Sequence, residues 1–105
     1  MKILINQNLI RNFDIRKGDT KFFDFEFYGN ICDSDPIDLT GWTKVFEVAD
    51  NFNNIILSKN DFILLTIDTA SLHPTECRYK MTLISPISEV FTFLQGFLRI
   101  KSNLL

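Results

Sequence analysis

The 105-residue sequence has little of the residues on which most catalytic and metal sites depend. It contains a single histidine, His73, and two cysteines, Cys32 and Cys77. Nucleophilic catalysis usually needs a histidine base held by a third group, and zinc sites need closely spaced pairs of ligands. His73 directly precedes Pro74 in an expected turn, and the cysteines lie far apart in the sequence. We therefore expect no enzymatic activity, no metal and no cofactor.

Phosphate-binding loops and convincing carboxylate sites are also missing. The four glycines are isolated, which excludes a Gly-rich phosphate loop. Asp24 and Glu26 resemble a glycosidase pair, but such a pair is also typical of the solvated face of a half-buried strand. Asp33, Asp35 and Asp38 could bind calcium, but the glycine and closing glutamate of the helix-loop-helix calcium loop are absent. We favour the structural explanation, strand face and turn, for both sets.

Neither an excess of one charge nor a long apolar run is present. The chain has 11 basic and 13 acidic residues, well mixed, with a net charge of −2, which argues against a nucleic-acid partner. No apolar run approaches the ~20 residues that cross a bilayer, so we expect no membrane partner. The apolar start ends at the polar residues 6–8 without a cleavage site, so it is not a signal peptide. Synthesis in the cytoplasm then predicts that Cys32 and Cys77 are free and buried.

The sequence is rich in phenylalanine, with eleven Phe against one Trp and two Tyr. A phenyl ring has no polar group, so most of these side chains should lie in the core. Phe23, Phe25 and Phe27 alternate with Asp24 and Glu26. Successive side chains of a strand point to opposite faces, so this pattern predicts a strand with rings inward and carboxylates outward. The same alternation recurs at residues 77–83, where apolar Cys77, Tyr79, Met81 and Leu83 are separated by polar residues.

Alternation and turn signals predict about seven strands and no long helix. One helical turn could form in residues 69–74 before Pro74 ends it. This pattern favours a single all-β domain over residues 1–105, an immunoglobulin-like sandwich of two antiparallel sheets. In that order Cys32 and Cys77 lie at opposite ends of the sandwich, too far apart for a disulfide. The expected strands are residues 9–15, 23–27, one that contains Phe46 and Val48, 55–57, 62–67, 77–83 and 90–100.

Two positions depart from the regular alternation. Lys44 falls on the same face as Phe46, so either its stem is buried at the sheet margin or the register is off by one. In the last strand, apolar residues change from odd positions such as Phe93 to even positions such as Leu98. An inserted residue flips the parity of every later side chain, so we expect a β-bulge at Gln95–Gly96.

Both ends of the chain are apolar. Ile3, Leu4 and Ile5 precede a polar break, and the sequence ends in Leu104 and Leu105. These residues could fray or pack on their own sheet. Alternatively, residues 1–8 form an N-terminal arm and residues 102–105 a C-terminal tail that pair with the edge of a neighbour's sheet. The second alternative makes all five residues candidate partner contacts.

An ordered set of motifs resembles a known family over residues 13–100. The motifs are IRKGDT at 15–20, PIDLTGW at 36–42 before VFEV, LHP at 72–74 before RYKM, and FLQGFLRI at 93–100. This set is similar to the N-terminal domain of phage baseplate upper proteins and to related phage tail and virion domains. Trp42 and Lys44 stand where that family has small or apolar residues. Family members also often continue into a receptor-binding or fibre domain, whereas this chain stops at Leu105.

The resemblance implies an immunoglobulin-like domain that docks a larger structural protein onto a virion, in multiple copies and without catalytic residues. A free-standing copy would decorate a capsid or act as an adaptor in a head fibre, tail or baseplate. We therefore expect a virion protein made in the host cytoplasm, whose partners are other virion structural proteins.

Two aromatic residues are further candidates for partner contacts. Trp42 follows a turn and Phe52 lies within one at residues 50–54, and aromatic side chains dominate interface energetics. Trp42 is equally well explained as a core residue. The alternative function is a carbohydrate-binding sandwich in which Trp42, Tyr28 and Tyr79 stack on sugar. A flat row of exposed aromatic rings would favour sugar binding, and exposed apolar termini would favour assembly.

Overall fold

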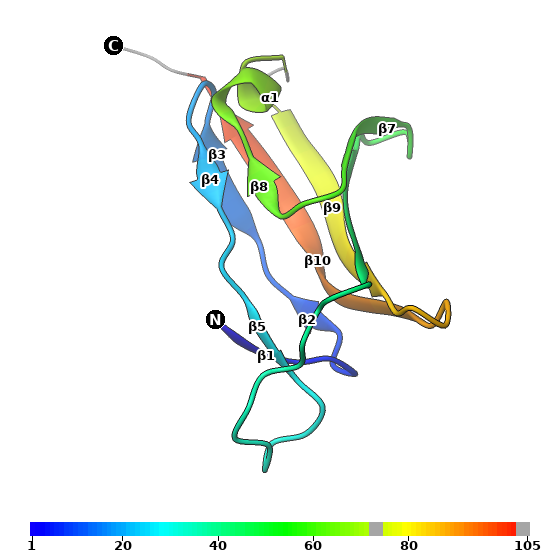
Figure 1. The fold of residues 1–105 in the computed structure, drawn as a ribbon. Helices are drawn as coiled ribbons and strands as arrows, with labels where there is room; N and C mark the ends of the chain where they lie inside the picture. Colours follow the sequence, from blue (N-terminus) through cyan, green and yellow to red (C-terminus); the bar gives the residue numbers. More distant parts are fainter. Residues whose placement is uncertain (72–74, 103–105) are drawn as a thin grey trace.

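The computed structural model describes residues 1–71 and 75–102, and most of them lie in or between β-strands (Figure 1). The only helix among these residues is the six-residue α1 (Thr66–Ser71), so the all-β prediction is confirmed. The strands are β1 (Lys2–Leu4), β2 (Leu9–Ile10), β3 (Phe13–Arg16), β4 (Lys21–Phe22), β5 (Glu26–Tyr28), β6 (Thr43–Ala49), β7 (Ile55–Lys59), β8 (Ile63–Leu64), β9 (Thr75–Ile84) and β10 (Val90–Lys101).

The strands form one large sheet and two small ones. The six-stranded sheet has the order β2-β10-β9-β6-β7, with β3 also paired to β10. Strands β7, β6, β9 and β10 pair with one another in antiparallel fashion, but β2 and β3 run parallel to β10, and β1 runs parallel to β5. The expectation of purely antiparallel sheets is therefore wrong at these pairs. No hairpin connects their strands, so no tight turn forces them to run in opposite directions.

The core lies between the large sheet and the layer formed by β4, β5 and β8. Phe23, Phe25 and Phe27 all point into it, and the Phe27 ring meets Phe93 of β10 edge-on at 4.8 Å between centroids. Asp24 and Glu26 are exposed, as predicted. Only part of residues 23–27 forms a regular strand. The alternation of these residues nevertheless determines which side chains enter the core. The fully buried large side chains are Phe46, Phe93, Ile3, Leu64, Met81, Leu83, Leu94 and Leu98.

Strands β6 and β9 follow the predicted alternation. Phe46 and Val48 of β6 are buried, and so are the four apolar residues predicted for β9. Lys44 is half-buried, and its ammonium lies 5.8 Å from the centre of the Phe62 ring. The predicted register was therefore right, because the lysine stem covers apolar surface while its charge reaches the margin. Thr82 is buried on the outward face of β9, where its hydroxyl is 3.2 Å from that of Thr92 on β10.

Strand β10 contains the expected bulge, but at another position. The register with β9 shifts between Thr92 and Leu94, which makes Phe93 the extra residue. The prediction of a bulge at Gln95–Gly96 was wrong. The change of parity shows that a residue is inserted, but it does not show at which position. The insertion lets Phe93 and Leu94, although consecutive, both enter the core.

The predicted strand over residues 62–67 is wrong beyond Leu64. Strand β8 ends there, and α1 begins at Thr66. The Asp68 carboxylate accepts a hydrogen bond from the Leu65 N–H at 3.0 Å, a side-chain contact that satisfies a backbone donor at the start of the helix. The helical turn expected in residues 69–74 is thus part of a helix that starts earlier, and residues 72–74 lie outside the described ranges.

Both cysteines are free, as expected, but only Cys77 is buried. Cys32 is exposed in the loop of residues 29–42 that connects β5 to β6. Its N–H donates to the Asn30 side chain at 2.8 Å, which holds Cys32 within a local turn. The prediction of burial was wrong for Cys32 because the turn at residues 29–32 keeps these side chains in solvent.

Candidate functional site

The N-terminal segment is part of the core of its own chain. Ile3 is 0% exposed and Ile5 is also buried, while Leu4 is half-buried. Strand β1 pairs with β5, and the Ile5 N–H donates to the Tyr28 carbonyl at 2.9 Å. Of the two alternatives for these three residues, the structure has the one in which they pack on their own sheet, because their apolar side chains fill the space beside Phe27. Leu104 and Leu105 lie outside the described residues.

The two aromatic candidates differ in their surroundings. Trp42 is half-buried and packs on the core, with its ring 6.0 Å from that of Phe91. Phe52 is 84% exposed in the turn between β6 and β7. Phe52 is therefore available to a partner, whereas much of Trp42 serves to cover the core.

The turn that carries Phe52 is well ordered by its own hydrogen bonds. The Asp50 carboxylate accepts from the N–H groups of Asn54, at 3.0 Å, and Phe52, at 2.8 Å. The bond from Asn54 has the larger effect of the two in lowering the pKa of Asp50. Asn53 adopts a positive φ of 63°, which asparagine tolerates better than most residues. The turn thus holds an apolar ring in solvent without support from the core.

Strand β7, which follows this turn, is an open edge of the large sheet. Among the described strands it pairs only with β6, so its other side has no strand partner. Ile55 and Ile56 are 54% and 41% exposed. An exposed apolar edge is a template for pairing with another chain. These isoleucines were not among the predicted site residues. Two adjacent apolar residues in a short strand after a polar turn nevertheless indicate that one of them is exposed.

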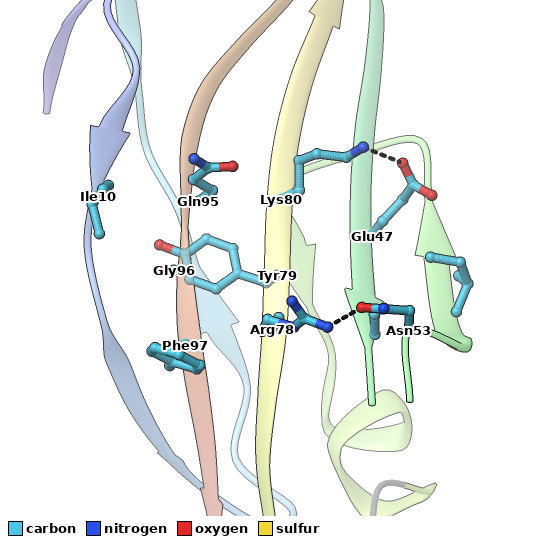
Figure 2. A pocket seen from close by; sticks show the side chains of 11 residues that line it. Ile10, Glu47, Asn53, Arg78, Tyr79, Lys80, Gln95, Gly96 and Phe97 are labelled. Atoms are coloured by element: carbon cyan, nitrogen blue, oxygen red, sulfur yellow. Dashed lines mark hydrogen bonds and ion pairs between the residues drawn. The ribbon is translucent and has the colours of Figure 1, made fainter. Parts of the chain in front are cut away.

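A groove of about 500 Å³ lies on the outer face of the large sheet (Figure 2). Two cross-strand rows of the register form its floor. One row joins Gln95, Lys80 and Glu47, and the other joins Phe97, Arg78 and Ala49. Ile10, Phe97 and Ile55 provide exposed apolar surface along it. No local sequence pattern predicts this site, because its residues come from different strands and meet only through the register.

The two basic side chains of the groove differ in the charge of their partners. The Lys80 ammonium lies 3.8 Å from the Glu47 carboxylate, whereas the Arg78 guanidinium donates to the neutral Asn53 side chain (Figure 2). Within residues 1–71 and 75–102, no carboxylate forms an ion pair with Arg78. Arg78 therefore supplies the positive charge of the groove, and its planar guanidinium suits a carboxylate.

A close crossing of the chain shapes one side of the groove. Gly96 lies opposite Tyr79 in the register, and a Cβ atom on Gly96 would lie 2.0 Å from the Arg11 carbonyl oxygen. The Tyr79 hydroxyl donates to the same carbonyl at 2.7 Å. Burial raises the pKa of Tyr79, so its hydroxyl stays protonated and keeps this hydrogen bond at neutral pH.

The other sites that the sequence suggested find little support in the geometry. Tyr28 and Tyr79 are buried, so they form no exposed row with Trp42 for stacking on sugar. In the described ranges no three His, Cys, Asp or Glu residues are grouped as metal ligands. His73 falls outside those ranges. No described helix has the length and hydrophobicity to span a membrane.

Comparisons of this chain with known proteins cover families, individual proteins and folds. Searches against protein-family models, curated proteins and solved structures found no match to this chain.

Proposed function

We propose that this chain is a non-enzymatic structural module that binds other proteins of a larger assembly through the open edge at β7. The observation that carries the proposal is that β7 combines an unpaired side with exposed apolar residues, Ile55 and Ile56, and follows a turn that exposes Phe52. A partner strand that added to this edge would gain backbone hydrogen bonds, while its side chains would contact these apolar groups.

We further propose an immunoglobulin-like architecture. The order β10-β9-β6-β7 corresponds to the G, F, C and C′ strands of a variable-type domain, and β3 lies parallel to β10 at the other edge of the sheet. This order supports the family that the sequence motifs resemble. On that basis the assembly is a phage virion, in which the chain serves as an adaptor or decoration on the capsid, head fibre, tail or baseplate, in several copies.

Binding to purified phage particles that lack the chain tests this function. Labelled chain is mixed with the particles, and bound and free protein are separated by sedimentation. We expect the wild type to bind and Ile56→Lys to lose at least about tenfold in affinity, because a lysine on an edge strand opposes strand addition. Phe52→Ser should also weaken binding, because it removes the exposed ring.

Ile87→Lys provides the matched control. Ile87 is also exposed and apolar, but it lies in the β9–β10 turn, at the end of the sheet away from the β6–β7 turn. The Ile87→Lys variant should bind particles like the wild type. All three variants should unfold like the wild type, which shows that they are folded. Absence of binding by the wild type, or equal loss in Ile56→Lys and Ile87→Lys, would count against the β7 edge as the docking surface.

A further inference from the structure

We propose that the outer-face groove binds a second copy of this chain, by receiving the acidic loop of residues 29–42. This contact joins two copies of the chain, whereas the β7 edge is proposed to bind other proteins. It depends on the charge and shape of two surfaces that lie far apart on one molecule.

The side chains of the groove suit an anion with apolar neighbours. Arg78 is exposed at its centre and is held by a neutral amide, so its charge is available to an incoming carboxylate. Ile10, at 69% exposed, and Phe97, at 42%, lie on one side of it. An arginine on a partly apolar surface favours a carboxylate that arrives with apolar side chains beside it.

The loop of residues 29–42 has this chemistry. It carries Asp33, Asp35 and Asp38 and no basic residue. The carboxylates of Asp33 and Asp38 accept hydrogen bonds inside the loop, whereas Asp35 is exposed and has no hydrogen bond or ion pair with any described residue. Ile31 is 78% exposed on the same loop. Asp35 and Ile31 therefore match the guanidinium and the apolar surface of the groove.

The loop lies away from the groove of its own chain. It joins β6 at Thr43, whereas the groove lies at the other end of that strand, beside Glu47 and Ala49. The strand from Thr43 to Ala49 is roughly 20 Å long at about 3.3 Å per residue. In Figure 1 the loop also projects beyond the end of the large sheet. The contact must therefore form between copies, and because it joins unlike surfaces it is head-to-tail and can repeat.

The oligomeric state of the isolated chain tests this contact. We expect sedimentation to show a mass that rises with concentration beyond that of a dimer, and falls again as salt screens the charges. Arg78→Asp and Asp35→Arg should each weaken association at least about tenfold, because each places like charges together. The variant with both substitutions should associate like the wild type, because the exchanged charges are again complementary in every contact.

Arg16→Glu is the matched control, because Arg16 is exposed on β3 outside the groove and undergoes a similar reversal of charge. It should associate like the wild type. A chain that stays monomeric at millimolar concentration would overturn the proposal. Failure of the double substitution to restore association would also overturn it, because Arg78 would then bind something other than Asp35. Binding of phage particles through β7 is measured separately, so either proposal can fail without the other.

Discussion

At the scale of single residues, Gly96 lies where two segments of the chain cross closely. The Arg11 carbonyl oxygen would be 2.0 Å from a Cβ atom at this position, and the two nearest atoms are both backbone atoms of Arg11, which cannot turn away as a side chain can. We predict that Gly96→Ala lowers the free energy of unfolding by about 2 to 3 kcal/mol, because the methyl group forces the β2–β3 connection away from β10. Urea denaturation measures this change.

Gly29→Ala is the control for Gly96→Ala. A Cβ atom on Gly29 would meet only the end of the Asp33 side chain, at 3.0 Å, and that carboxylate can move. We expect this variant to lose less than about 1 kcal/mol. Equal effects of the two substitutions would show that the Arg11 crossing does not constrain Gly96.

At the scale of elements, Asp68 connects β7, β8 and α1. Its carboxylate lies 2.7 Å from the Lys59 ammonium at the end of β7, and it accepts from the Leu65 N–H after β8. Burial alone would raise the pKa of Asp68, but the hydrogen bonds from Lys59 and Leu65 lower it below the ordinary value. The folded state therefore favours the ionised carboxylate, and the resulting stability is present above the ordinary pKa and lost as the pH falls.

We predict that Asp68→Asn lowers the free energy of unfolding by about 2 kcal/mol at neutral pH and reduces the loss of stability toward acid pH. Urea midpoints measured from neutral to acid pH test both effects. Asp14→Asn is the control, because Asp14 is 3.4 Å from Lys101 but both side chains are largely exposed, so their ion pair contributes little. If Asp68→Asn lost as much stability toward acid pH as the wild type, the ionised Asp68 carboxylate would not be a source of that loss.

The sequence predicted which face of each strand is buried better than it predicted which strands pair with each other. Alternation correctly identified the buried sides around Phe25, Phe46 and Tyr79, because side chains along a strand point to opposite faces. It did not reveal the parallel partners of β1 and β3, because pairing between distant segments leaves no local pattern. A nearly continuous apolar run likewise concealed the change from β8 to α1.

The candidate site was predicted only where a single segment determines it. Phe52 was named because aromatic side chains dominate interface energetics, and it is exposed because it lies in a turn rich in Asp and Asn. The groove was missed, because Arg78, Lys80 and Gln95 become neighbours only through the β9–β10 register. The edge at β7 depends on the strand order of the whole sheet, which no local pattern contains.

At the scale of the whole molecule, the N-terminal segment extends the layer that contains β5. The Met1 amino group donates to the Asp24 carbonyl at 2.8 Å, and β1 pairs with β5 along its length. Ile3 is buried against the core, whereas the adjacent Leu4 is half-buried. An arm that binds a neighbour would leave the isolated domain unaffected by truncation of its side chains, whereas a core strand would not.

We therefore predict that Ile3→Ala lowers the free energy of unfolding of the monomer by about 3 kcal/mol, because it leaves a cavity in a closely packed core. Leu4→Ala, the adjacent control, should lose less than half as much, since its side chain already contacts solvent. Thermal and urea unfolding at low concentration, where copies do not associate, measure both variants. Wild-type stability of Ile3→Ala, together with weakened binding to phage particles, would instead make residues 1–8 an arm that inserts into a partner.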